Sequence, residues 1–430
     1  MNSSLAPIFR NTRILISGNA ISSFFGILYL AILTRALSLD QFGIYAIYGT
    51  FVNIVGRFTC LQTWQAQIHY ALHADISKTP KKIANIFFFG WVIDILGGLL
   101  GFGVALALGL VAPHIFGLSG GSLSNVAVLA SLLLFNWTNV PTAYFRIKDR
   151  FFPQALYQTL SSFFQLCAVF ILWLIGEERL IFYLATTAAN DIIGKTCFFI
   201  HAFVDGMKEG IVEKNHISLT DLKNDCPGIG KFIITSNLTG IVRGTRDFDI
   251  ILVNIVLGAQ LAGVFKIAKT LIAALGKLTG PFYQSMYPEI NRLVAKSATS
   301  NLQYLLKRLS KVLALITGSV WLGFVLIGPY VLEIVFGREY ISAYSVSAWS
   351  LAAITIWSAA QPLSNALVAM RRNGRLLIIQ LIVVPVYLFL LTVLVPKIGL
   401  TGAGVSLVLA HLLWSGAVLW ALVIQIRSIQ

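Results

Sequence analysis

The sequence predicts an all-α polytopic membrane protein with about twelve transmembrane helices. Its mean hydropathy is +0.80 and only 11% of its 430 residues are charged, whereas an ordinary soluble domain carries about 25%. Apolar runs of about 20 residues recur along the whole chain, and each is long enough to cross a ~30 Å hydrocarbon core. These runs leave no stretch for a sizeable soluble domain.

The apolar runs form two groups of six, separated by glycine, proline and charged residues. The predicted crossings lie near residues 14–34, 42–60, 83–112, 125–145, 154–176 and 180–204, and near 231–257, 262–285, 309–328, 344–367, 376–395 and 401–425. They predict an N-terminal six-helix lobe over 1–204, a cytoplasmic linker over 205–230 and a C-terminal six-helix lobe over 231–430. The first run is too long for a cleavable secretory signal, so we expect a retained helix.

The distribution of Lys and Arg predicts the orientation in the membrane. If the N-terminus is cytoplasmic, the cytoplasmic segments carry twenty-one basic residues and the opposite side carries four. The positive-inside rule therefore places both termini in the cytoplasm. Most of the +15 net charge is then topological, and no nucleic-acid partner is expected.

The two halves also resemble each other locally. When RALSLDQFGIYAIYGTF (35–51) is aligned with IVLGAQLAGVFKIAKTL (255–271), Gly43 falls on Gly263 and Tyr45 on Phe265. Six crossings in each half give both repeats the same orientation. This arrangement is typical of parallel repeats with a binding cavity between the lobes.

Eleven ionisable side chains fall inside or at the margins of the predicted crossings. They are Arg57, Lys195, Arg243, Arg246, Lys266, Lys269 and Lys277, with Asp94, Asp191, Asp247 and Asp249. Each ionised group near mid-membrane costs about 2.5 to 3.5 kcal/mol, so eleven facing lipid would cost on the order of 30 kcal/mol. We therefore expect them to face a polar interior.

The basic residues of the second half share a depth and a helix face. Arg243 lies twelve residues beyond the inner end of its crossing, about 18 Å deep at helical rise. Lys266, Lys269 and Lys277 fall within an arc of about 80° on the next crossing.

Two interpretations of these charges remain open. Local pairs would make the aspartates structural counter-ions: Arg243 with Asp247, Arg246 with Asp249, and Asp191 with Lys195. Even with all four acids paired, three cations remain in the interior, and an anionic ligand would neutralise them. Arginine suits phosphate because its fork binds two oxygens, while lysine acts on the same group as a point charge.

Asp94 stands alone in WVIDILGG and also allows two interpretations. It binds a proton or sodium ion that drives transport, or it pairs with a cation across the lobe interface. Asp247 and Asp249 are further candidates for ion coupling. No constellation of serine, cysteine or histidine has a catalytic context, so we expect no enzyme, no metal centre and no cofactor beyond a coupling H⁺ or Na⁺.

Four stretches carry a resemblance to a known family. They are ILTRALSLDQFGIYAI (32–47), RDFDIILVNIVLGAQLAGVFKIAKTL (246–271), GPYVLEIVFGREYISAYS (328–345) and GLTGAGVSLVLA (399–410). They resemble the oligosaccharide flippases, the exporters of O-antigen and other polysaccharide repeat units in the MATE-like multidrug/oligosaccharidyl-lipid/polysaccharide superfamily. The resemblance implies two six-helix lobes around a cationic cavity.

The resemblance also implies an activity and its partners. The protein would move an undecaprenyl-pyrophosphate-linked repeat unit from the cytoplasmic to the outer leaflet of the inner membrane by alternating access, for O-antigen or other surface polysaccharide. A polysaccharide polymerase and chain-length proteins would be partners. We expect the pyrophosphate to contact Arg57, Arg243, Arg246, Lys266, Lys269 and Lys277.

Three alternatives to this function remain open. A lipid II flippase has the same charge requirement, and a MATE-type drug/cation antiporter would call for a net acidic interior instead. A membrane glycosyltransferase or polymerase should carry a large extramembrane loop with functional carboxylates, whereas the outer loops are short.

Overall fold

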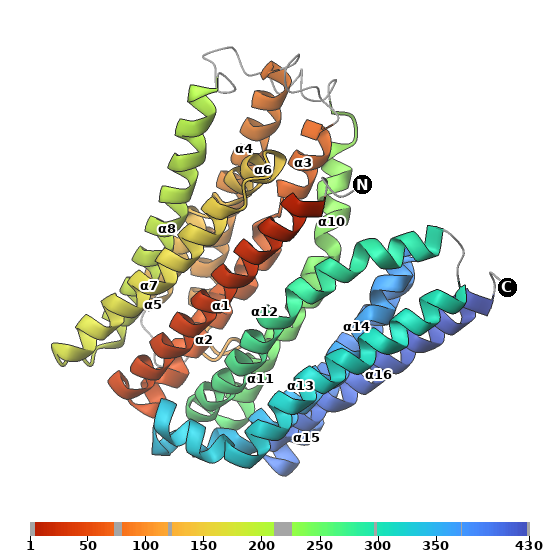
Figure 1. Ribbon diagram of the computed structural model, residues 1–430. Helices are drawn as coiled ribbons and strands as arrows, with labels where there is room; N and C mark the ends of the chain where they lie inside the picture. Colours follow the sequence, from red (N-terminus) through yellow and green to blue (C-terminus); the bar gives the residue numbers. More distant parts are fainter. Residues whose placement is uncertain are drawn as a thin grey trace. The chain divides into compact units, whose positions relative to one another are not determined.

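The computed structural model describes residues 5–72, 80–118, 123–209, 226–295, 299–370 and 372–427. Every regular element in these ranges is helical (Figure 1). The N-terminal half contains α1 (Leu5–Ala36), α2 (Leu39–Thr59), α3 (Trp64–Leu72), α4 (Pro80–Val111), α5 (Leu123–Leu134), α6 (Asn139–Ile147), α7 (Phe152–Leu174) and α8 (Leu180–Lys208). Then follow α10 (Ile229–Gly244), η1 (Thr245–Asp247), α11 (Phe248–Leu257), α12 (Ala259–Ala295), α13 (Thr299–Phe336), η2 (Arg338–Ser342), α14 (Ala343–Ala369), α15 (Asn373–Ile398) and α16 (Thr401–Arg427).

Ten segments of the described chain are long and apolar enough to cross a membrane. They are Ser17–Ala36, Leu39–Ala71, Lys82–Val111, Leu123–Ile147, Phe152–Leu174, Ala259–Lys277, Thr299–Phe336, Arg338–Ala369, Gly374–Ile398 and Thr401–Arg427. The predicted total of about twelve also counts α8 and the α10–α11 pair. The protein is therefore an all-α, multi-pass membrane protein.

Two predicted crossings are interrupted. The predicted 125–145 crossing is divided into α5 and α6 by non-helical residues 135–138, and the predicted 231–257 crossing is divided into α10 and α11 by the 3₁₀ turn η1. Each of these crossings is therefore built from two helical pieces rather than from one continuous helix. Both breaks coincide with polar sequence, NWTN at 136–139 and GTRD at 244–247, where side chains compete for backbone hydrogen bonds.

The described residues group into two compact units. The first takes its residues from 1–29 and 48–244, and the second from 30–47 and 245–430. α10 therefore belongs with the N-terminal helices, while the segment around the α1–α2 turn belongs with the C-terminal helices. Residues 210–225 of the predicted linker lie outside the described ranges, and the predicted lobes at 1–204 and 231–430 stay a prediction.

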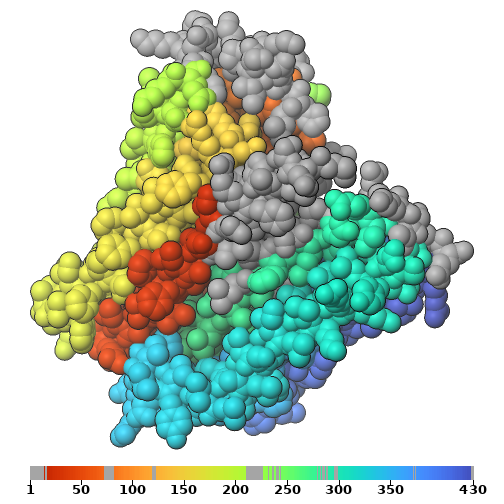
Figure 2. All heavy atoms as spheres, in the orientation of Figure 1, coloured from red at the N-terminus to blue at the C-terminus, as the bar shows by residue number. Residues whose placement is uncertain are grey.

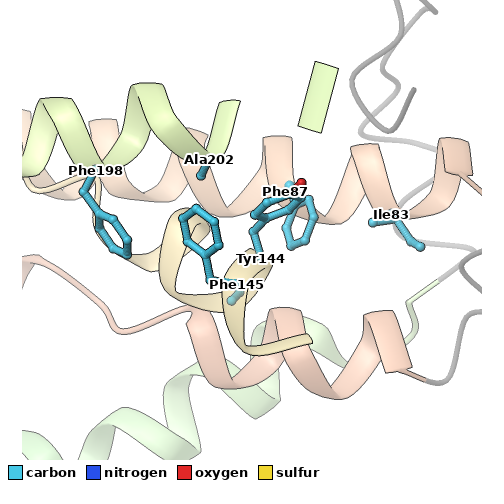
Figure 3. Packing of buried hydrophobic residues seen from close by; sticks show 7 residues of the cluster. Ile83, Phe87, Tyr144, Phe145, Phe198 and Ala202 are labelled. Carbon is cyan, nitrogen blue, oxygen red and sulfur yellow. The ribbon is translucent and has the colours of Figure 1, made fainter. Parts of the chain in front are cut away.

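The first unit has an aromatic core where α4, α6 and α8 meet. Figure 3 shows Phe87 from α4, Tyr144 and Phe145 from α6, and Phe198 from α8 turned toward one another. The Phe145 and Phe198 rings are stacked, with centroids 5.6 Å apart. This packing fixes the short helix α6, which is too brief to be stable alone.

α10 is attached to the first unit by a buried amide. Asn237 Oδ1 accepts from the Gln62 backbone N–H at 2.8 Å, and Asn237 Nδ2 donates to the Gln62 carbonyl at 3.2 Å. Gln62 lies in the non-helical link between α2 and α3, so its backbone groups have no helical partners. The asparagine satisfies both and holds α10 beside the α2–α3 link.

In the second unit, the ends of α1 and α2 pack against the C-terminal helices. Thr34 Oγ1 donates to the Phe336 carbonyl at 3.1 Å, and Arg35 donates to the Ile334 carbonyl at 2.6 Å. The Phe42 ring meets the Tyr340 ring edge-on at 5.6 Å.

Large apolar side chains are exposed along the outer faces of single helices in each unit. On the face drawn in Figure 2, α7 is yellow and α13 is cyan. Exposed residues include Phe164, Ile171 and Leu174 on α7, and Leu326 and Ile334 on α13. Such faces suit contact with lipid chains.

Candidate substrate site and a buried carboxyl

Charged side chains converge in the second unit, where α11 packs against α12 and α15. We call this group the charge cluster. It consists of Arg246 and Asp247 from η1, Asp249 from the first turn of α11, Lys266 and Lys269 from α12, and Tyr387 from α15. The helix break at η1 brings these acidic residues to the start of α11.

Lys269 is the centre of the charge cluster. Its ammonium lies 2.7 Å from Asp249 Oδ1 and 3.1 Å from Asp247 Oδ1, so one cation serves two carboxylates. The Asp249 side chain is only 5% exposed, whereas those of Asp247 and Lys269 are 28% and 23% exposed. Lys269 therefore stabilises a buried negative charge and still has access to the surface.

Tyr387 completes the environment of Asp249. Its hydroxyl donates to Asp249 Oδ2 at 2.9 Å, and its side chain is 1% exposed. Both oxygens of this carboxylate are thus hydrogen-bonded, as a buried charge requires. Asp249, held by Tyr387, therefore fixes the Lys269 ammonium from its buried side.

The predicted local ion pairs have different outcomes. The Asp191–Lys195 pair is confirmed at 2.6 Å. The Arg246–Asp249 pair was wrong, because η1 interrupts the helix on which that spacing was counted and Asp249 turns to Lys269 and Tyr387 instead. The side chain of Arg243 lies outside the described residues, so its pairing with Asp247 stays a prediction.

Lys266 lies one helical turn before Lys269, at the edge of the same cluster. Its charge is close enough to act on Lys269, Asp247 and Asp249. Among the described residues it forms no ion pair. Three cations and two carboxylates give the charge cluster one excess positive charge, which favours an anionic ligand.

Two predicted site residues lie elsewhere. Lys277 is exposed on α12, about 16 Å beyond Lys266 at helical rise. Arg57 is exposed near the end of α2 in the first unit, where its side chain lies over Gly244. Lys277 is therefore peripheral to the charge cluster, and Arg57 stays a candidate of the first unit.

Asp94 lies in the first unit, on α4, and is 3% exposed. Asn139 Nδ2 donates to its Oδ1 at 2.7 Å and to the Leu61 carbonyl at 3.1 Å. Its other oxygen, Oδ2, is buried without a hydrogen-bond partner in the described structure. The interpretation of Asp94 as one half of an ion pair finds no cationic partner among these residues.

Sequence reasoning missed three polar side chains near these sites. They are Tyr387, Asn139 and His411. His411, on α16, is 4% exposed, and its Nδ1 lies 3.0 Å from the Ala353 carbonyl. The charge of Arg246 reaches both Tyr387 and His411. For Tyr387 and His411, a polar ring in the middle of an apolar run, far from the membrane interface, was the available signal.

Similarity to known sequences shows the family of this chain. The sequence profile described as "Polysaccharide biosynthesis protein" matches residues 32–345, which is well over half of the chain. The chain belongs to this polysaccharide biosynthesis family. A further relative is the "Inner membrane protein YghQ" of Escherichia coli (strain K12), 27% identical over 341 residues that cover 79% of this chain and 95% of the relative.

Solved structures show the fold of this polysaccharide biosynthesis protein. It is similar to an inward-facing MATE multidrug resistance transporter of the MOP superfamily, with a TM-score of 0.70 and 12% identity over 97% of this chain and 94% of the other. It is also similar to the lipid II flippase MurJ in an inward closed conformation, with a TM-score of 0.67 and 12% identity over 97% and 86%. The predicted MATE-like fold is confirmed.

Proposed function

We propose that this protein is a flippase that moves an undecaprenyl-pyrophosphate-linked oligosaccharide repeat unit from the cytoplasmic to the outer leaflet of the inner membrane. The glycan would serve O-antigen or another surface polysaccharide. Membership of the polysaccharide biosynthesis family and the MATE-like fold support this function. The observation that carries it is the excess positive charge of the charge cluster, in which the described side chains are three cations, Arg246, Lys266 and Lys269, and two carboxylates.

The physical need for such a protein follows from the substrate. Sugars and phosphates cannot cross about 30 Å of hydrocarbon without losing their hydrogen bonds, whereas the polyprenyl tail already prefers lipid. The protein has to offer a polar path to the head group and leave the tail in the bilayer. Alternating access does this without forming or breaking a covalent bond, so no catalytic residue is required.

The charge cluster suits a diphosphate because its two lysines differ in their ion pairing. Lys269 is held by Asp247 and Asp249, while Lys266 has no carboxylate partner among the described side chains. We infer that phosphate oxygens approach Lys266 first and then share Lys269 with the partly exposed Asp247, with Arg246 nearby as a further cation. Buried Asp249 keeps Lys269 oriented, so binding is reversible and the head group can be released.

The cell context of this proposal follows from the predicted topology. Both termini would lie in the cytoplasm, where the lipid-linked unit is assembled, and the unit would be delivered outside to a polymerase with its chain-length proteins. Arg57 and Lys277 would contact the glycan or its phosphates outside the charge cluster, and Arg243 would add a further cation.

A double variant tests the function. Arg246→Ala with Lys266→Ala should abolish surface glycan while the amount of protein in the membrane stays the same, because two phosphate contacts are lost. Lys397→Ala is the matched control, since it removes one exposed cation at the end of α15. Normal glycan display by the double variant would refute the site assignment.

The same cells distinguish a lipid II flippase, which the fold similarity to MurJ also suggests. Expression of this protein during depletion of the cell's own lipid II flippase should fail to restore growth. Restored growth would overturn the repeat-unit assignment in favour of lipid II.

A further inference from the structure

The buried carboxyl of Asp94 lies near the middle of the α4 span, fourteen residues after Pro80 and seventeen before Val111. These positions correspond to about 21 Å and 25 Å along the helix axis. A carboxyl that is 3% exposed at this depth is costly when ionised. It requires a functional or structural explanation.

Two helix breaks face α4 close to Asp94. α2 ends at Thr59 and is followed by non-helical residues 60–63, and α5 is separated from α6 by non-helical residues 135–138. Glycines permit the approach: a Cβ on Gly97 would lie 2.8 Å from the Thr59 carbonyl oxygen, and one on Gly98 would lie 2.5 Å from that of Leu133. Broken helices at membrane depth are typical of ion pathways in transporters.

The hydrogen bonds of Asp94 satisfy neither of its charge states completely. Ionised, it has the Asn139 side-chain amide at 2.7 Å on Oδ1 and the Asn139 backbone N–H close to the carboxylate, but no cation among the described residues. Protonated on Oδ2, it has no acceptor there. A carboxyl with a purely structural role would have a partner for one state, whereas this one can change state without breaking a strong bond.

The other ionisable groups around Asp94 do not compensate its charge. Cys60, which directly follows α2, is near enough to the Asp94 carboxyl for an electrostatic interaction with its thiol. Lys195 on α8 also interacts electrostatically with this thiol. Lys195 forms an ion pair with Asp191 at 2.6 Å. The α5–α6 break contributes neutral Asn139, and α10 contributes neutral Asn237 beside Gln62.

We propose that Asp94 is a reversible proton-binding site and that its protonation drives the transport cycle. The carboxylate takes a proton from water on one side of the membrane to become a neutral acid, and gives that proton up to water on the other side. No electrons move and no other bond changes. Proton binding by Asp94 is independent of the proposed flippase function. Coupling of this protonation to transport rests on the proposed function.

The surroundings favour a proton over a sodium ion. Hard cations bind several oxygen ligands at once. The Asn139 amide that bonds Asp94 also donates to the Leu61 carbonyl, so this carbonyl oxygen is already engaged. A proton needs only one carboxylate oxygen.

Proton binding can be measured on the purified protein without substrate. Dicyclohexylcarbodiimide reacts with protonated carboxyls in apolar surroundings, and peptide mass spectrometry locates the product. We expect labelling of Asp94 that decreases as the pH is raised, because only the neutral acid reacts, together with no labelling of the half-exposed Asp191 and loss of the labelled peptide in Asp94→Asn. Absent labelling, or labelling independent of pH, would overturn the proposal.

A second variant covers the case in which Asp94→Asn does not fold. Asn139→Ala removes a donor that stabilises the ionised form, so labelling of Asp94 should persist to higher pH. An unchanged pH profile would contradict the assigned geometry. Protection of Asp94 by Na⁺, with K⁺ as the control, would replace the proton with sodium and overturn the proposal.

Coupling is tested in proteoliposomes that contain a lipid-linked oligosaccharide. A pH gradient should accelerate flipping by the normal protein and have no effect on Asp94→Asn. Gradient-independent flipping by the normal protein would refute coupling, even with Asp94 labelled. No flipping under any condition, with Asp94 still labelled as a function of pH, would refute the proposed function and leave the proton site standing.

Discussion

Gly43 of α2 and Gly263 of α12 pack backbone against backbone in the second unit. A Cβ on Gly263 would lie 2.9 Å from the Gly43 Cα, and a Cβ on Gly43 would overlap the Ala259 carbonyl. The sequence alignment of the two halves places these two glycines at equivalent positions. Equivalent residues of the repeats thus meet at one close crossing, which small side chains make possible.

The crossing predicts that Gly43→Ala destabilises the protein. The added methyl group meets backbone atoms of α12 that cannot move aside, so the melting temperature in detergent should fall. Gly49→Ala is the matched control on the same helix, since nothing lies within 4 Å of a Cβ there. Gly49→Ala should be neutral or about 0.5–1 kcal/mol more stable. Equal melting temperatures for the two variants would contradict the close crossing.

The shared lysine predicts a large loss of stability in Lys269→Met. The change removes the cation that pairs with buried Asp249, at a cost on the order of 3 kcal/mol. Adding Asp249→Asn to Lys269→Met should recover much of that stability, because the unpaired buried charge is removed. Thermal unfolding of the single and double variants measures both effects, and a stable Lys269→Met protein would show that the ion pairs contribute little.

The buried amide predicts that α10 loosens in Asn237→Ala. The Gln62 N–H and carbonyl lose their partner, which costs about 1–3 kcal/mol. Leu238→Ala is the control, because its side chain is 45% exposed on the next position of α10. Hydrogen exchange at residues 229–244 should rise in Asn237→Ala and not in Leu238→Ala; identical exchange would mean that the amide does not hold α10.

Lys266 and Lys277 of α12, which form no ion pair within the described part of the chain, should differ in function. Lys266 lies beside the charge cluster, so Lys266→Gln should weaken substrate binding by roughly ten- to a hundredfold, the range for a lost hydrogen bond to a charged group. Lys277 is exposed, so Lys277→Gln should reduce export only slightly. Surface glycan at limiting expression measures both. A larger loss in Lys277→Gln would move the site along α12.

The sequence was sufficient for the fold and for the part of the chain that holds the charges. Apolar runs report membrane crossing directly, and the cost of burying charge showed that residues 243–277 include a polar interior. The Asp191–Lys195 pair was also predictable, since it depends only on spacing within a continuous helix.

Contacts between side chains of different helices were not predictable from the spacing of residues in the sequence. Asp249 contacts Lys269 and Tyr387 because the 3₁₀ turn η1 separates α10 from α11 and places Asp249 in the first turn of α11. Tyr387 and Asn139 reach their carboxylates from positions 138 and 45 residues away in the sequence. Only the packing of the helices brings such residues together.

Binding of undecaprenyl pyrophosphate to the purified protein in nanodiscs tests the central claim most directly. The charge cluster predicts that Arg246→Gln with Lys266→Gln weakens this binding by about a hundredfold or more, while Lys397→Gln leaves it unchanged. Equal affinities for the normal protein and the double variant would show that the cluster does not hold the diphosphate.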